Sequence, residues 1–305
     1  MPKTNKSKKK SPQFTSFSQR NRVGRAVLRF RSKRIIALSL VVLLASIGAG
    51  GYFLTREKHS MAAITSLSTP APCTFTVTSA NIYSIWKTYS PGQVMNMAGN
   101  GATVCISGTF NMGVTRVTST KVTLRSADGT RAKIYGKFNV AGKGNRFLNL
   151  YVDGQGDNSG TFLLEGSAEN NLIEGNYITS TAPNKATSDF NIRQGICVNV
   201  GPGGGGLSAN GPKYNTINAN RIFNCGWGKY DQAIYMSNNQ YTHVTNNYVY
   251  DNPMFGLQFF PDSDYAVVEN NVFYNNSAGV TFSGASTTQI SQNNSFRYNI
   301  VANTG

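Results

Sequence analysis

Residues 225–232 combine side chains that could remove a proton from a substrate and neutralise its negative charge. The segment reads Cys-Gly-Trp-Gly-Lys-Tyr-Asp-Gln and leads into Tyr235. About one repeat earlier, Arg193 precedes the strand that begins at Gly195, just as Asp231 precedes the strand that begins at Ala233. Proton removal beside a substrate carboxylate requires a base, together with a cation that neutralises the carboxylate. Arg193, Lys229, Asp231 and Tyr235 are therefore the candidate catalytic residues. The competing interpretation is a solvated ion pair between Arg193 and Asp231, which contributes about 0–1 kcal/mol.

Aromatic side chains near this segment, and on later strands, could stack on the apolar face of a ring-shaped ligand. We predict that five of them bind substrate: Trp227, Tyr230, Tyr248, Tyr250 and Tyr274. The last three share an outward wall with Tyr177 and Phe223. The alternative is stacking between neighbouring strands, which contributes about 0.2–1 kcal/mol per pair.

Metal-ligating residue types are scarce. The chain has two histidines, His59 and His243, so a site with several histidine ligands is excluded. Asp262 and Asp264 could bind Ca²⁺ or cap a turn, and the turn is the favoured interpretation. We predict no metal and no cofactor, with Ca²⁺ as the open alternative.

A repeat defines the elements that position these residues. Asparagine recurs between apolar residues that lie three positions before it and two positions after it, at 176, 220, 247, 271 and 299, and Asn149 in Leu148–Val152 is interpreted as an earlier copy. The intervals are 27, 44, 27, 24 and 28 residues, and the long one reflects an insertion at about 182–213. Strands stacked about 4.8 Å apart would let these side chains hydrogen-bond to one another and to turn backbone. We therefore expect the asparagines to be structural.

Between these asparagines lie alternating segments that predict strands with one apolar face. Two aligned apolar columns are expected: Phe162, Ile196, Ile234, Leu257 and Val280, and beside them Leu164, Val198, Met236, Phe259 and Phe282. The intervening column, which contains Tyr235, faces outward. Such strands at a period near 25 residues predict a stacked β-solenoid.

The beginning of the body carries a resemblance to a known family. Residues 91–93 (Pro-Gly-Gln) form a turn that leads into strands at 102–110 and 122–126, the first of which ends in Gly-Thr-Phe. With the repeats, these segments resemble the right-handed parallel β-helix superfamily, the pectate-lyase-like fold, over roughly residues 76–305. The resemblance implies an all-β right-handed parallel β-helix solenoid and a polysaccharide partner. The paired-Asp, Gly-His-Gly and Asp-Pro-His-Asp motifs of its enzymes are absent.

The charge is concentrated at one end. The net charge is +16, yet residues 1–34 hold twelve Lys or Arg and no acid, which leaves 17 basic and 13 acidic residues elsewhere. We therefore predict no nucleic-acid partner. Residues 35–54 are twenty uncharged residues, which predicts a single transmembrane helix preceding the solenoid, with a cleaved signal peptide as the alternative. The expected organisation is a basic cytoplasmic tail (1–34), a signal-anchor helix (35–54), a linker (55–75) and an extracytoplasmic β-helix (76–305).

The four cysteines agree with export. Three pairings are possible, and neighbour pairing, Cys73 with Cys105 and Cys197 with Cys225, is favoured over unpaired thiols. The asparagine repeat still runs at 299 and 303, so we expect additional residues or another chain to cover this end.

Two functions remain open. The favoured one is a membrane-anchored protein that binds surface or extracellular polysaccharide without catalysis. The alternative is a polysaccharide lyase or glycoside hydrolase that acts on an acidic polysaccharide.

Overall fold

The computed structural model describes residues 71–79, 89–156, 159–181, 195–201 and 211–304. The chain divides into two compact units, Met1–Thr55 and Arg56–Gly305, and every described residue belongs to the second. The described residues contain no helix that is long and apolar enough to cross a membrane. The predicted transmembrane segment, residues 35–54, lies outside them, as does Arg193.

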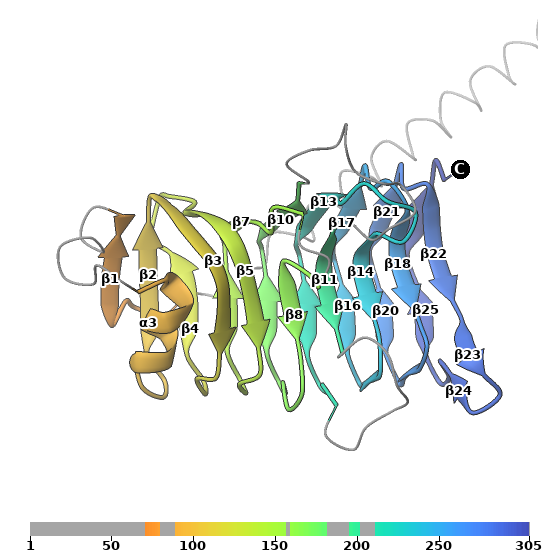
Figure 1. Ribbon diagram of the computed structural model, residues 1–305, viewed down its shortest axis with the longest axis horizontal. Helices are drawn as coiled ribbons and strands as arrows, with labels where there is room; N and C mark the ends of the chain where they lie inside the picture. Colours follow the sequence, from red (N-terminus) through yellow and green to blue (C-terminus); the bar gives the residue numbers. More distant parts are fainter. Residues whose placement is uncertain (1–70, 80–88, 157–158, 182–194, 202–210, 305) are drawn as a thin grey trace, which may run out of the picture. The chain divides into compact units, whose positions relative to one another are not determined.

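The described part of the second unit is a solenoid of parallel strands (Figure 1). Its first sheet has nine strands among the described residues, in the order β1 (Phe75–Thr78), β2 (Thr103–Ser107), β4 (Thr123–Ser126), β6 (Arg146–Leu148), β9 (Leu172–Glu174), β12 (Thr216–Asn218), β16 (His243–Thr245), β20 (Val267–Glu269) and β25 (Ser295–Arg297). Each strand pairs with its counterpart in the next coil, so sheet order follows chain order.

The second sheet has two arms that meet at β5 (Lys133–Val140). The first arm consists of β7 (Tyr151–Asp153), β10 (Tyr177–Ser180), β13 (Arg221–Cys225), β17 (Tyr248–Tyr250), β21 (Val272–Tyr274) and β26 (Ile300–Ala302). The second arm consists of β8 (Phe162–Leu164), β11 (Ile196–Val200), β14 (Gln232–Met236), β18 (Phe255–Phe259) and β22 (Ala278–Phe282), and β3 (Thr109–Val117) pairs with β5. Two small ladders join β15 (Asn239–Gln240) to β19 (Ser263–Asp264), and β23 (Gly284–Ser286) to β24 (Gln289–Ile290).

The core lies between the two large sheets, where the apolar faces of their strands point. Along the first arm one fully buried column consists of Ile134, Val152, Ile178, Ile222, Val249 and Phe273. This confirms the predicted all-β parallel solenoid. It forms because identical strand alternation in every coil places the same apolar position inside.

The predicted register is wrong in one coil. Val198, and not Ile196, lies opposite Ile234, and Asn199 lies opposite Tyr235. A shift of two residues keeps each side chain on its own face, so alternation alone did not distinguish the two registers.

The asparagine ladder is present as predicted from Asn176 onward. The side-chain oxygen of Asn220 accepts the Asn176 N–H at 2.9 Å, and that of Asn247 accepts the Asn220 N–H at 3.0 Å. Asn149 was assigned one position too early. Leu150 occupies the ladder position there, and Asn149 takes the left-handed turn conformation before it, with φ of 55°.

Two ladders at other corners were missed. One consists of Asn145, Asn171 and Asn215, whose side-chain oxygens accept backbone N–H groups at 2.9–3.1 Å. The other joins Asn252 to Asn276. At these three corners, buried amides thus satisfy backbone groups that water does not reach.

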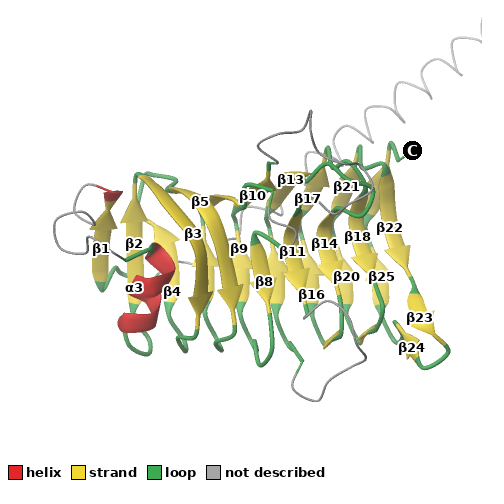
Figure 2. Cartoon of the chain, in the orientation of Figure 1, coloured by secondary structure: helices red, strands yellow, loops and turns green. Residues whose placement is uncertain are grey.

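The Pro-Gly turn predicted at 91–93 begins a helix. Helix α3 (Pro91–Met97) starts at Ser90, whose side chain accepts the Gln93 N–H in a capping box (Figure 2). A Cβ atom at Gly92 would lie 2.6 Å from the Thr115 methyl group, so glycine permits the helix to approach β3 closely.

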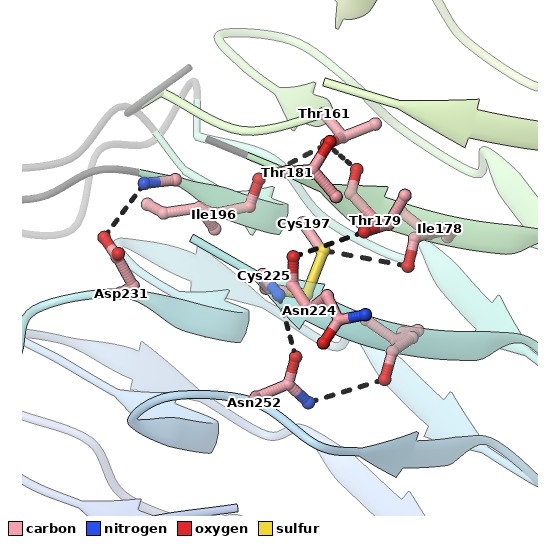
Figure 3. The surroundings of a disulfide bond; sticks show 12 residues. Thr161, Ile178, Thr179, Thr181, Ile196, Cys197, Asn224, Cys225, Asp231 and Asn252 are labelled. Carbon is pink, nitrogen blue, oxygen red and sulfur yellow. Dashed lines mark hydrogen bonds between the residues drawn. A yellow bond between two sulfur atoms is a disulfide. The ribbon is translucent and has the colours of Figure 1, made fainter. Parts of the chain in front are cut away.

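The cysteines are paired as neighbours. Cys73 bonds to Cys105, and Cys197 bonds to Cys225 (Figure 3). The second bond joins β11 to β13, one strand from each arm of the second sheet. At the far end of the solenoid, apolar side chains of β22, β25 and β26 are exposed, among them Phe282, Phe296 and Val301.

Candidate functional site

The carboxylate of Asp231 organises the loop between β13 and β14. It is fully buried and accepts the backbone N–H of Gly195 at 2.9 Å (Figure 3). It also accepts the backbone N–H groups of Trp227 and Gly228. A Cβ atom at Gly226 would lie 2.2 Å from the same carboxylate. Asp231 therefore acts here as a structural acceptor that holds the loop against the preceding coil.

The rest of the predicted catalytic group does not form an open site among the described residues. Tyr235 alternates with the core residues Ile234 and Met236 and therefore faces outward as predicted, but it is covered and only 4% exposed. Lys229 is half-buried, with its ammonium 5.0 Å from the centre of the Tyr230 ring. Trp227 and Tyr230 lie in the same loop, whereas the other predicted binding residues lie elsewhere.

The predicted calcium ligands serve the fold. Asp262 and Asp264 are buried, and the Asp264 carboxylate accepts the Gln292 N–H at 2.9 Å. Over the described ranges, no cluster of three His, Cys, Asp or Glu side chains could hold a metal ion.

The outer surface of the first arm gathers aromatic and basic side chains. One position per coil forms a column in register: Lys133, Tyr151, Tyr177, Arg221 and Tyr248. Each member is adjacent in sequence to a core residue, so strand alternation directs it away from the core. These five residues, with Arg131 and the neighbouring Phe223, Tyr250 and Tyr274, are called the aromatic–cationic face.

Tyr177 lies at the centre of this face. The Arg131 guanidinium carbon is 4.0 Å from the Tyr177 ring centre, and that of Arg221 is 5.2 Å away. Arg131 also donates to the carbonyls of Leu150 and Gly175, at 3.3 and 2.9 Å. Two cations against one ring form paired cation–π contacts, which fix the arginine positions.

The cations of this face have no acidic partner in the part of the chain that the structure describes. Arg131, Lys133 and Arg221 form no salt bridge among the residues that the structure describes. Burial lowers the pKa of the Arg131 guanidinium. The nearby Tyr177 raises this pKa, and the positive charge of Arg221 lowers it. The face therefore presents positive charge that an external anion can pair with.

The tyrosines beyond Arg221 form a stacked group. The Tyr248 and Tyr250 ring centres are 4.4 Å apart, and those of Phe223 and Tyr250 are 5.3 Å apart. Burial raises the pKa of Tyr248 and Tyr250, and the Asp251 charge contributes in the same direction. These phenols therefore stay neutral at physiological pH and can donate hydrogen bonds.

The structure thus brings Tyr248, Tyr250 and Tyr274 together, as predicted for an aromatic wall. The sequence reasoning missed Arg131, Lys133, Tyr151 and Arg221. A signal was available for Arg221, because it directly follows a ladder asparagine, as Tyr177 and Tyr248 do.

Comparisons with known proteins agree with this architecture. Residues 184–305 match the family described as "Right handed beta helix region". Pectate lyase Bsp165PelA from Bacillus sp. N165, solved in complex with trigalacturonate, is similar with a TM-score of 0.50 and 12% identity, covering 80% of this chain and 86% of that one. Pectate lyase Pel9A has a TM-score of 0.41 and 13% identity, covering 79% of this chain and 81% of that one.

The Dettilon tailspike protein gp208 is also similar, with a TM-score of 0.40 and 10% identity over 66% of this chain and 51% of that one. No curated protein sequence matches the chain significantly. At these identities the likeness concerns the fold alone.

Proposed function

We propose that this right-handed parallel β-helix protein binds an acidic polysaccharide along the aromatic–cationic face, without cleaving it. The observation that carries the proposal is the column of Tyr177 between Arg131 and Arg221, whose cations have no salt-bridge partner among the described residues. A sugar acid offers both a carboxylate for a guanidinium and an apolar ring face for a tyrosine.

The repeat of the solenoid suits a polymer. Neighbouring coils are about 4.8 Å apart, so a chain that runs along the axis meets a new side chain of the column at each coil. Successive sugar residues would therefore meet aromatic and basic side chains in turn. A site with many modest contacts gains affinity as the polymer lengthens.

The lack of catalysis is part of the proposal. The Asp231 carboxylate accepts three backbone N–H groups, and Tyr235 is buried. The surroundings of these two of the four predicted catalytic residues therefore favour a structural role for them. A lyase or hydrolase is the alternative, and the experiment below separates it from binding.

Membrane attachment is also proposed. The uncharged run at 35–54 follows a strongly basic segment, which favours a cytoplasmic N-terminus and an exported body. The two disulfide bonds of the body are consistent with an oxidising compartment.

The test uses the full chain in mild detergent and a polymannuronate hexasaccharide, measured by calorimetric titration. We expect Arg221→Gln and Tyr248→Ala each to weaken binding about tenfold, since buried or stacked anchors commonly contribute more than 1 kcal/mol. Arg116→Gln is the matched control, because Arg116 is exposed, pairs with Glu165 and lies on β3, outside the face.

Unchanged affinity in both face variants would refute the binding site. The same samples are assayed for unsaturated products and new reducing ends. Turnover that Lys229→Ala abolishes would replace the binding function with the lyase alternative.

A further inference from the structure

A second aromatic surface lies at the corner that precedes the nine-stranded sheet. Tyr214, Tyr241 and Tyr265 occupy the same position in three consecutive coils, because the Tyr214 N–H donates to the Gln240 carbonyl and the Tyr241 N–H to the Asp264 carbonyl. Successive ring centres are 4.9 Å apart and the ring planes differ by 11° and 12°. These three residues are called the tyrosine ridge.

The backbone of the ridge is unusual for tyrosine. All three residues are in the left-handed region, with φ of 57°, 56° and 56°. Bulky side chains rarely adopt this conformation, whereas asparagine tolerates it. The coils on either side use asparagine at this position, Asn170 and Asn293, with φ of 56° and 58°.

Burial does not explain why tyrosine replaces asparagine here. Tyr214 is 46% exposed and Tyr265 is 42% exposed, so the rings add little to the core. Their stacking offsets part of the backbone cost, but it leaves large aromatic surfaces in water. The rings are therefore suited to contact with something outside the chain.

The open surfaces are at the two ends of the stack. Within the described ranges, Tyr214 and Tyr265 each have a ring neighbour on one side only. In the next coil beyond each end ring, the equivalent backbone position holds the smaller residue asparagine, Asn170 or Asn293. A flat ring from outside can therefore continue the stack at either end.

The charge around the ridge differs from that of the aromatic–cationic face. Asp264 is buried and accepts a backbone N–H, and Glu169 pairs with Lys143 at 2.9 Å. The nearby Lys213 charge contributes to the lowered pKa of Glu169. The ridge therefore offers aromatic faces and phenol hydroxyls. The acidic and basic side chains near it balance one another, so the ridge does not favour a charged ligand.

We propose that the tyrosine ridge is a second binding site, which takes an uncharged hexopyranose chain. The apolar C–H face of a neutral sugar ring stacks on the end rings, and its hydroxyls pair with the tyrosine hydroxyls. This site lies at a corner of the solenoid, whereas the aromatic–cationic face lies on the first arm of the second sheet. The two sites take different classes of sugar, so this proposal does not rest on the acidic-polysaccharide proposal.

The test is affinity electrophoresis of the full chain in gels that contain hydroxyethylcellulose, with polymannuronate gels run in parallel. The key variant replaces Tyr214, Tyr241 and Tyr265 by asparagine, the residue that neighbouring coils use in the same conformation. We expect an unchanged or higher melting temperature, at least a tenfold weaker retention by hydroxyethylcellulose, and unchanged retention by polymannuronate. The pair variant Tyr214→Asn with Tyr265→Asn removes only the end rings and should show most of the loss.

Equal retention of the wild type and either variant by hydroxyethylcellulose would overturn the proposal. So would a wild type that is not retained by the neutral polymer, whatever its behaviour toward polymannuronate. Loss of polymannuronate retention alone in the ridge variants would also overturn it, because the site would then recognise charge. If the triple variant failed to fold, the pair variant would decide by the same criteria.

Discussion

The asparagine ladder makes a quantitative prediction at Asn220. Its side-chain nitrogen donates to the Ile173 carbonyl at 2.9 Å, and its side-chain oxygen accepts the Asn176 N–H at 2.9 Å. All of these groups are buried. Replacement by alanine leaves the Asn176 N–H without its acceptor, which costs about 1–3 kcal/mol, and removes one donor from the carbonyl, which adds about 1 kcal/mol. We therefore expect Asn220→Ala to lower the free energy of unfolding by roughly 2–4 kcal/mol.

Guanidinium unfolding followed by circular dichroism checks this value on the full chain in constant detergent. Asn111→Ala is the matched control, since Asn111 is an exposed strand residue and should change the stability by less than about 0.5 kcal/mol. A loss below about 0.5 kcal/mol for Asn220→Ala would show that the ladder is not what satisfies the turn backbone.

Three further outcomes are expected. Replacing Cys197 and Cys225 by serine should lower the free energy of unfolding by roughly 3 kcal/mol, given a sequence separation of 28 residues, and no change would argue against the bond. A reductant should destabilise the wild type more than this variant, because the variant retains only the Cys73–Cys105 bond. The hydrogen bond from Lys143 lowers the pKa of Glu169. The ion pair therefore stabilises the fold at pH values above the ordinary pKa of glutamate, and this stabilisation is lost as the pH falls through the lowered pKa of Glu169. Lys143→Ala should raise the pKa of Glu169 in a carboxyl NMR titration. Burial raises the pKa of Tyr248, so its phenolate absorbance should develop only at pH values above the usual tyrosine pKa near 10. The difference between the wild type and Tyr248→Phe isolates this absorbance, and ionisation of Tyr248 at or below the usual pKa would contradict the packing.

Much of the fold was predictable because each coil repeats the same environment. The apolar columns and the ladder from Asn176 onward follow from strand alternation and from the need to satisfy buried turns. The same regularity explains one of the errors: a two-residue shift at Ile196 leaves the alternation intact, so only the strand pairing reveals it. The error at Asn149 was detectable from the sequence, because Arg146 lies three residues before Asn149, whereas Phe147 and Val152 flank Leu150 at the spacing of the repeat.

The candidate site was less predictable, because its members come from different coils. Tyr177 and Arg221 are adjacent in the sheet but 44 residues apart in sequence, across the insertion. The repeat period did not reveal that Arg131 lies over the same ring.

The sequence by itself determined that the chain builds a parallel β-solenoid, since periodicity specifies which side of each strand is buried. The tertiary structure decided which polar residues are available. Asp231 and Tyr235 are buried by neighbouring segments, whereas Tyr177, Arg221 and the three ridge tyrosines reach the surface. Local patterns specify the face on which a side chain lies, but exposure depends on what the rest of the chain places over that face.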